Sequence, residues 1–194
     1  TLDRSSAASD VYKRQASLSA VTAAQKLGGE IHALVTGSSS HAKAVAEAAS
    51  KVQGVSKVLV STSDAFSALL AEPIAPLIES LVKSKSYTHV VAGHTAVGRD
   101  IIPRAAVCLD SSQVSDIIEV QGEDTFVRPI YAGNALATVM SKDGVKVVTV
   151  RGTAFDAASA EGGSASVEEV DAGEVPQPTK LVQEKMSCLL YTSP

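Results

Sequence analysis

The chain has 194 residues, enough for one domain with a sizeable core, because domains commonly run to about 100–200 residues. Its formal net charge of −4 argues against the broad basic surface of a nucleic-acid-binding protein. No apolar run approaches the ~18–20 residues that a membrane-spanning helix needs. The two cysteines, Cys108 and Cys188, predict neither a disulfide framework nor a metal cluster.

Helical and extended patterns then alternate along most of the chain. Apolar residues at helical spacing predict helices at residues 16–27, 41–50, 74–83 and 99–109. Short β-branched or apolar runs predict strands at residues 30–36, 57–61, 88–92 and 117–120. Strands alternating with helices are typical of an α/β fold, here a layered helix–sheet–helix domain with a mostly parallel sheet.

A C-terminal β-hairpin is predicted from residues 126–140 and 145–150, both rich in β-branched and small apolar residues. The turn between them is placed at residues 141–144, where Gly144 can adopt the positive φ of a tight turn. Gly133 and Asn134, inside the first run, indicate a bulge or a close approach of another backbone segment.

The two ends of the chain differ from its middle. Residues 1–15 and 187–194 resemble translated sequencing adapters, and we interpret them as foreign tails that lack the pattern of a signal peptide. Residues 159–186 are dominated by Ala, Ser, Gly and acids and predict a solvated linker, with Glu168 and Glu169 as a solvated charge patch. The folded α/β domain is therefore expected at residues 16–158.

The loop from Gly93 to Asp100 is the most site-like local stretch. A strand leads into small residues, Gly98 permits close backbone approach, and a helix begins near Arg99, so this loop can hold an anion such as phosphate. The competing interpretation is an ordinary strand–helix turn without a ligand. Neither a Walker A nor a G-x-G-x-x-G motif occurs, which favours the ordinary turn. His94 lacks a nucleophile or carboxylate at motif spacing and is expected to be an exposed loop residue.

Two strings carry a family resemblance: FVRPIYAGNAL at residues 126–136 and VRGTAFDAA at residues 150–158. In order and spacing they resemble the alpha subunit of electron transfer flavoprotein. The resemblance runs from about Ala16 to about Lys185, covers the N-terminal domain of that subunit, and stops before its FAD domain. It implies a nucleotide-binding-like domain, similar to the adenine nucleotide alpha hydrolases.

The resemblance also implies a function. The complete protein would pair with a beta subunit that holds AMP, and would carry one FAD, bound mostly by the domain that follows. It would pass electrons from acyl-CoA and related dehydrogenases to a membrane quinone oxidoreductase in fatty acid beta-oxidation. It would thus be an electron carrier rather than a classical enzyme. It would work in the mitochondrial matrix, or in the cytoplasm of a bacterium.

Within such a heterodimer this segment would be a docking platform for the beta subunit, with no catalytic residue and no metal ligand of its own. Its interface candidates are Arg128, Tyr131, Asn134, Arg151 and Phe155, because arginine beside aromatic residues is typical of binding hot spots. The competing interpretation is that the arginines are surface residues beside Asp116, Glu119 or Asp124. A different function stays open: a freestanding adenine-nucleotide-binding module that uses the loop from Gly93 to Asp100. A small hydrolase is a weaker option, because no G-x-S-x-G motif is present.

One departure from the family concerns stability. In the family a short apolar strand precedes the first helix and lies inside the sheet, whereas residues 4–15 here contain no comparable run. Loss of an interior strand would leave two rows of backbone groups unpaired, each group costing about 1–3 kcal/mol if buried. The isolated chain is therefore expected to be poorly stable, and cooperative unfolding above about 55 °C would contradict this.

Overall fold

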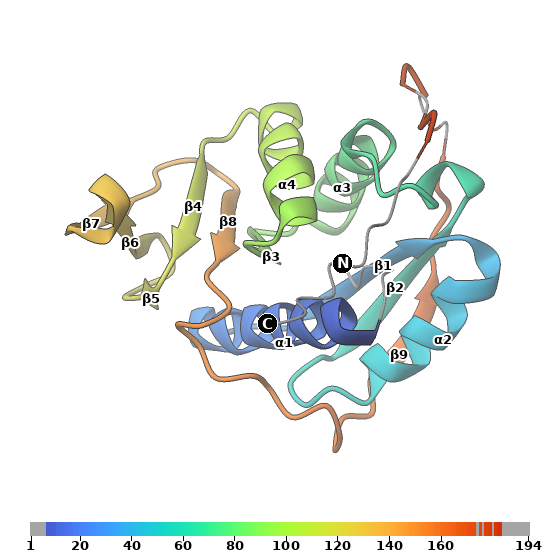
Figure 1. Ribbon diagram of the computed structural model, residues 1–194, viewed down its shortest axis with the longest axis horizontal. Coiled ribbons are helices and arrows are strands. Elements are labelled where there is room, and N and C mark those ends of the chain that lie inside the picture. The colour runs from blue at the N-terminus through green and yellow to red at the C-terminus, as the bar shows by residue number, and fades with distance from the viewer. Residues whose placement is uncertain (1–6, 174, 176, 180, 184–194) are drawn as a thin grey trace, which may run out of the picture.

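Helices and strands alternate from the first helix to the fourth strand (Figure 1). The computed structural model describes residues 7–173, 175, 177–179 and 181–183. Its helices are α1 (Ala7–Leu27), α2 (Ser39–Ser50), α3 (Ala71–Lys85) and α4 (Ala96–Cys108), with short 3-10 turns η1 (Asp64–Phe66) and η2 (Tyr131–Gly133). Its strands are β1 (His32–Gly37), β2 (Lys57–Thr62), β3 (His89–Gly93), β4 (Gln113–Ile117), β5 (Glu119–Val120), β6 (Thr125–Ile130), β7 (Ala135–Met140), β8 (Lys146–Val150) and β9 (Ser166–Glu169).

Most of the strand pairs are parallel. One sheet has the order β1-β2-β9 and a second has the order β3-β8-β4, and every pair in both is parallel. A third sheet, β5-β6-β7, is antiparallel. The predicted α/β fold with a mostly parallel sheet is confirmed.

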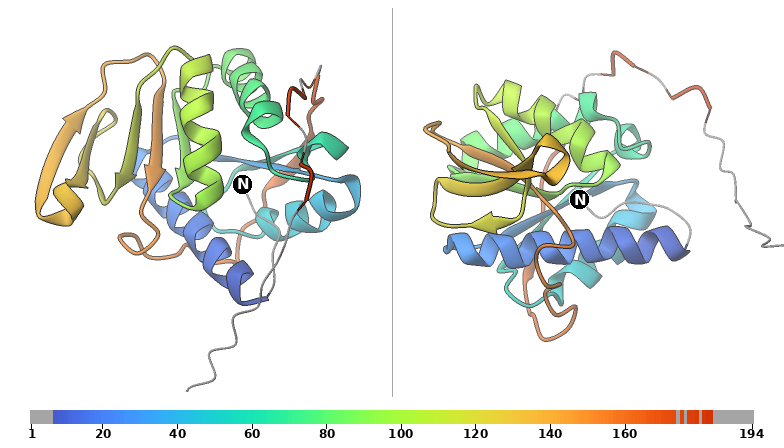
Figure 2. Two further views of the ribbon diagram at one scale, coloured as in Figure 1. Left: turned by 45° about the horizontal axis from the view of Figure 1, so that its top comes forward. Right: turned by 60° about the vertical axis from the view of Figure 1, so that its left-hand side comes forward.

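Helices cover both faces of the strands. Figure 2 (right) shows α3 and α4 on one side of the strands and α1 and α2 on the other. Because parallel strands buried on both faces are continuously apolar, β8 carries Val147, Val148 and Val150, each fully buried. Phe66, Ile74 and Ile101 fill the layer between the strands and α3 and α4. The parallel strands thus form a central layer with an apolar core on each side.

The hairpin lies earlier in the chain than predicted. β6 pairs with β7 through η2, where Tyr131, Ala132 and Gly133 all have positive φ (50°, 55° and 91°) and reverse the chain. Gly144 does not have a positive φ, and β8 inserts between β3 and β4 as a parallel strand instead of pairing with β7. The prediction of a turn at residues 141–144 is therefore wrong. Gly133 marks the turn itself rather than a bulge.

Residues 159–186, predicted to be a linker, contain the strand β9. β9 runs parallel to β2, and Val170 N donates to Val60 O at 2.8 Å. Glu168 lies 2.7 Å from Lys85 Nζ and 3.0 Å from Lys57 Nζ, so it is an ion-pairing residue rather than part of a solvated charge patch. Gly163 permits this path, because a Cβ there would lie 2.3 Å from Val52 O. The linker prediction is wrong for this part.

The first helix is longer than predicted, since α1 begins at Ala7 and includes residues read as a foreign tail. Residues 1–6 of that tail and the predicted tail at 187–194 lie outside the described residues. From Ala16 onward α1 packs closely on the ends of the strands: Ser19 Oγ donates to Gly152 O and to Phe155 O, both at 2.9 Å. This anchors the helix beneath β3 and β8.

Candidate functional site: the carboxyl edge, the hairpin and an apolar slot

Polar side chains meet where β3, β8 and β4 end. Thr149 Oγ1 on β8 lies 3.0 Å from His94 Nδ1 and accepts hydrogen bonds from Gln113 Nε2 at 3.3 Å and from the Asp116 backbone N–H at 3.1 Å. His94, expected to be exposed, is half-buried because this bond draws it onto the strands. The carboxyl edge of a parallel sheet is the usual position for ligands in α/β folds.

Arg151 and Asp116 form a two-point ion pair at this edge. Arg151 Nε donates to Asp116 Oδ1 at 3.0 Å and Arg151 Nη2 donates to Oδ2, the fork geometry that arginine favours with carboxylates. This hydrogen bonding raises the pKa of Arg151. Asp116 has a φ of 61° and lies at a register shift between β4 and β8, so the ion pair holds a backbone conformation that a non-glycine residue adopts at a cost.

The arginines singled out in the sequence lie around the same histidine. Burial lowers the pKa of His94; Asp116 opposes this, and the positive charges of Arg99, Arg151 and Arg128 add to it. Arg128 Nε is buried and has no hydrogen-bond partner among the described residues. Cationic groups thus outnumber carboxylates at this edge, and Asp116 is engaged by Arg151.

The loop from Gly93 to Asp100 has a clear packing role. Thr95 caps α4, its Oγ1 accepting from Gly98 N at 3.2 Å. A Cβ on Gly98 would lie 2.1 Å from Gly93 O, so glycine lets the first turn of α4 rest on the end of β3. Nothing in these contacts tests whether Gly98 and Arg99 bind an anion, which stays a prediction.

The hairpin of β6 and β7 lies at one end of the molecule (Figure 1) and exposes apolar side chains. Tyr131, Leu136 and Met140 are 79%, 64% and 59% exposed, and we call these three the hairpin patch. Along β7 exposed and half-buried residues alternate, so Leu136 and Met140 share the outward face. Asn134 Nδ2 donates to Tyr131 O at 2.9 Å and stabilises the turn.

Phe155 lies inside the domain, unlike the other residues predicted for an interface. Its side chain is 6% exposed and packs with Ala20, Val148 and Val150, and Lys26 Nζ lies 5.0 Å from the centre of its ring. Packing therefore accounts for this residue, and its contact with a partner stays a prediction.

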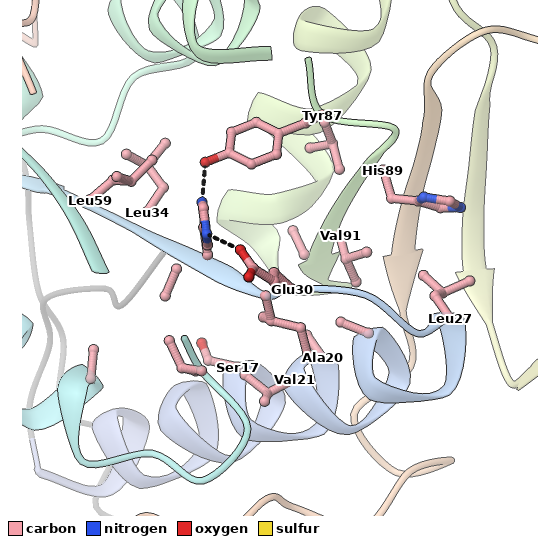
Figure 3. Close-up of a pocket in the computed structure, with 18 of the residues that line it drawn as sticks. Ser17, Ala20, Val21, Leu27, Glu30, Leu34, Leu59, Tyr87, His89 and Val91 are labelled. Atoms are coloured by element: carbon pink, nitrogen blue, oxygen red, sulfur yellow. Dashed lines mark hydrogen bonds and ion pairs between the residues drawn. The ribbon is translucent and has the colours of Figure 1, made fainter. Parts of the chain in front are cut away.

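A cavity of about 340 Å³ lies between β1 and β3 (Figure 3). Its walls come mainly from apolar residues of α1, α3 and the two strands. Its polar feature is a short chain of side chains: the Tyr87 hydroxyl is hydrogen-bonded to His32 Nδ1, and His32 Nε2 lies 3.5 Å from Glu30 Oε2. Sequence reasoning did not bring these three together, because Tyr87 lies 55 residues from His32 and the three match no motif. We call this cavity the slot.

The slot does not suit the flavin dinucleotide that the family resemblance implies for the complete protein. A dinucleotide carries a doubly charged pyrophosphate, which sites commonly hold through lysine or arginine. The charged or titratable residues that line the slot are Glu30, His32, Tyr87 and His89, and neither lysine nor arginine is among them. No chemical step is therefore derived through a flavin at this position.

The architecture is that of a layered α/β domain with parallel strands ending at a polar edge. A family model described as "Electron transfer flavoprotein domain" matches residues 12–175. The chain belongs to this electron transfer flavoprotein family.

Curated relatives agree with the family match. The chain is 49% identical over 176 residues to a "Probable electron transfer flavoprotein subunit alpha, mitochondrial" of Cryptococcus neoformans, covering 89% of this chain and 51% of the relative. It is 55% identical over 163 residues to the "Electron transfer flavoprotein subunit alpha" of Pseudomonas aeruginosa, covering 82% and 52%. A Caenorhabditis elegans protein with the same printed name as the Cryptococcus one is 44% identical over 158 residues, covering 81% and 47%. The chain spans about half the length of these relatives and matches their N-terminal part.

A membrane-spanning helix and a metal-binding cluster are both absent from the part of the chain that the structure describes. Among those residues no helix is both long and apolar enough to cross a bilayer. Nor do histidine, cysteine and acidic side chains gather there into a group that could hold a metal ion.

Proposed function

We propose that this chain is the N-terminal domain of an electron transfer flavoprotein alpha subunit. The match over residues 12–175 and the names of the curated relatives support this. The complete protein is then an FAD-dependent electron carrier between acyl-CoA and related dehydrogenases and a quinone oxidoreductase. The flavin supplies the redox chemistry, since no amino-acid side chain is a reversible two-electron carrier of this kind.

The part of this domain in that carrier is to dock the beta subunit, which would hold AMP. The observation that carries this proposal is the hairpin patch, Tyr131, Leu136 and Met140, which is exposed although its residues are apolar. Aromatic residues and methionine are enriched at protein–protein interfaces, and their burial releases ordered water. The hairpin that carries the patch lies at one end of the domain (Figure 1), where a partner could reach it.

The arginines at the carboxyl edge would complement the hairpin patch. Arg128 lies on β6, three residues before Tyr131, and its Nε has no hydrogen-bond partner among the described residues. Because this Nε is itself buried, the partner would engage Arg128 through the positive charge of its guanidinium group, which favours a carboxylate nearby. Arg151, already bonded to Asp116, would instead keep the edge rigid.

The location follows from the relatives rather than from the domain. Those of Cryptococcus neoformans and Caenorhabditis elegans are named as mitochondrial. We therefore place the complete protein in the mitochondrial matrix if its source is eukaryotic, and in the cytoplasm if it is bacterial.

The proposal is tested by measuring affinity for a matching beta subunit. The variant Tyr131→Ala/Leu136→Ser removes two side chains of the hairpin patch, and we expect it to bind at least about tenfold more weakly. Val107→Ser is the matched control, because Val107 is 79% exposed but lies on α4, away from the patch. Equal affinity of the patch variant and the control would contradict docking through the hairpin.

The family role is tested separately by flavin content. The chain is co-expressed with the beta subunit, with and without the C-terminal half of a relative fused to it, and FAD absorbance is read on the purified complex. Flavin only in the fused version, with the beta subunit present in both, is the expected result. A chain that retains neither partner nor flavin, but binds ATP or AMP alone, would favour a freestanding nucleotide-binding module.

A further inference from the structure

One stretch of chain joins the parallel sheet to the hairpin. β4 pairs in parallel with β8, and β5, which follows it directly, pairs antiparallel with β6. Ile117 O accepts from Arg151 N at 3.0 Å, on the side of β8. The next residue, Ile118, donates its N–H to Val127 O of β6 at 2.8 Å. The change of partner thus takes place between two consecutive residues, and we call residues 116–118 the joint.

The backbone leaves the regular strand at Asp116. Its φ is 61°, and the pairing of β4 with β8 changes register between Val114 and Ile117. Its N–H donates to a side chain of β8, Thr149 Oγ1, at 3.1 Å. An irregularity of this kind bends a strand and redirects the residues that follow it, here β5 and the hairpin.

The side chain of Asp116 has a role besides the bend. Glycine adopts a positive φ without steric cost, so glycine would serve the bend best if nothing else were required. Asp116 instead places a carboxylate that is 19% exposed against the guanidinium group of Arg151. Arg151 Nε donates to Oδ1 at 3.0 Å and Nη2 donates to Oδ2, and two parallel bonds fix the angle between the two groups as well as their distance.

Arg151 holds the joint through both its backbone and its side chain. It directly follows β8, whose last residue, Val150, is fully buried. Its N–H bonds to Ile117 O and its guanidinium group bonds to Asp116, so one residue ties together two consecutive residues of the joint. β8 is the central strand of the sheet β3-β8-β4. The joint is therefore anchored to a buried central strand.

The hairpin patch lies at a distance from this anchor. Figure 1 shows β6 and β7 beyond β4, at one end of the domain. Phe126 of β6 is fully buried in the core beside β8, whereas Tyr131 and Leu136 are exposed. The extended chain from Phe126 to Ile130 spans about 13 Å, so a rotation of about 10° at its root moves the far end by about 2 Å. Preorganised interfaces seldom shift their backbone by more than about 1 Å on binding, so the angle of the hairpin matters for docking.

We propose that Arg151 and Asp116, which we call the clasp, set the angle between the hairpin and the parallel sheet and so hold the hairpin patch in the orientation that docking needs. Both are positioning residues, which act through the hairpin and need no contact of their own with the partner. The clasp thereby lowers the conformational cost that a loosely held hairpin would bear on binding. Its effect on docking rests on the function proposed above for the hairpin patch, whereas its effect on the angle does not.

The angle is measured on the full chain by pulsed electron paramagnetic resonance, which gives the distance between two spin labels. The labels are attached through Thr138→Cys, on the exposed face of β7, and Val107→Cys, on the exposed face of α4. Cys108 and Cys188 are replaced by serine so that only these two positions react. With the clasp intact, we expect one narrow distribution of distances.

Two variants of Asp116 then release the hairpin. Asp116→Gly removes the carboxylate but tolerates the positive φ, and its distribution should broaden, or its mean shift, by at least about 2 Å. Should Asp116→Gly fail to fold, Asp116→Asn gives the same comparison, because asparagine also tolerates a positive φ and lacks the charge. Glu119→Gln is the matched control, since it removes an exposed carboxylate of β5 outside the clasp and should leave the distances unchanged.

Affinity for a matching beta subunit is measured on the same variants without labels. Asp116→Gly and Arg151→Lys are expected to bind at least about fivefold more weakly, and Glu119→Gln as tightly as the unsubstituted chain. Lysine keeps the charge of Arg151 but cannot form the two-point bond, so a loss in Arg151→Lys points to positioning rather than to a direct charge contact with the partner. In the Tyr131→Ala/Leu136→Ser background, Asp116→Gly should weaken binding by less than about twofold further, because the patch that the clasp orients is already lost.

The outcomes are separable. Altered label distances in Asp116→Gly, together with weaker binding of both clasp variants, support the proposal. Distances equal to those of the unsubstituted chain overturn it. Altered distances with unchanged affinity overturn the role of the clasp in docking. If Tyr131→Ala/Leu136→Ser itself binds as tightly as Val107→Ser, docking through the hairpin fails, and the label distances alone decide whether the clasp sets the angle.

Discussion

Replacing Gly98 by alanine tests the packing of α4 on β3 directly. An alanine Cβ at this position would lie 2.1 Å from Gly93 O and 3.3 Å from Gly93 C. Carbon atoms in contact normally lie about 3.5–4.0 Å from their neighbours. Both atoms it meets are backbone, so no side chain can rotate away, and the first turn of α4 must move by more than about 1 Å.

The cost can be estimated from this displacement. Overpacking in a closely packed region costs about 1–3 kcal/mol, and straining the Thr95 cap that accepts from Gly98 N adds about 1 kcal/mol. Alanine has a higher helix propensity than glycine, which stabilises the variant by about 1 kcal/mol and offsets part of this cost. We expect a net loss of about 1–3 kcal/mol and a midpoint lower by roughly 2–12 °C for a chain of this size.

The measurement is thermal and urea unfolding followed by circular dichroism. Gly144→Ala is the matched control, because an added Cβ there would meet no heavy atom within 4 Å and the φ of Gly144 is not positive. This control should change the stability by less than about 0.5 kcal/mol. A midpoint for Gly98→Ala within about 1 °C of both the unsubstituted chain and the control would refute the packing role of Gly98.

Three further predictions concern charged and titratable groups. Hydrogen bonds from Lys85 and Lys57 lower the pKa of Glu168 below its ordinary value of 4.5. The ionised Glu168 therefore stabilises the fold fully above pH 4.5, and this stabilisation is lost as the pH falls through the lower folded-state pKa. Glu168→Gln should lower the unfolding midpoint at neutral pH and leave it unchanged in acid. Burial lowers the pKa of His94 below 6.5, so the stability of the fold should decrease as the pH falls from 6.5 through the folded-state pKa. His94→Gln should remove this pH dependence from melting curves recorded over the same range. Arg151→Ala should cost about 1 kcal/mol in urea unfolding, and a double-mutant cycle with Asp116→Asn that shows no coupling energy would contradict the ion pair.

The α/β layering could be predicted because the spacing of apolar residues along the chain indicates each helix and strand separately. Residues 74–83 show helical spacing of apolar side chains, and α3 indeed spans Ala71–Lys85. The run at residues 57–61 likewise became β2. Where burial follows the period of an element, the sequence alone indicates the element.

The choice of strand partners could not be predicted in the same way. Residues 145–150 look identical in pattern whether they pair with β7 or enter the sheet beside β3, and only the burial of β8 on both faces decides this. β9 was missed because it is a short edge strand whose residues, apart from a half-buried Glu168, are exposed, which gives no apolar alternation. Strand pairing depends on residues far apart in the chain, so a short stretch of sequence gives little information about which strands will pair.

The candidate sites show the same division. Arg128 and Arg151 were singled out from their neighbours in sequence, but the partner of Arg151 was one of three candidate carboxylates until the fold brought Asp116 to it. The contact of His32 with Tyr87 joins residues 55 positions apart and had no signal in the sequence. Tyr131 and Asn134 proved to be turn residues, a role set by their backbone conformation.

The position of β8 between β3 and β4 has a consequence for synthesis on the ribosome. β3 and β4 leave the ribosome well before Lys146–Val150, yet both pair with that later segment, which is the one parallel neighbour that each has among the described strands. At about 5–20 residues per second, the apolar surfaces of both strands wait for seconds in a nascent chain. This domain therefore folds late in its own translation, and its early half is a natural client for chaperones that shield apolar segments.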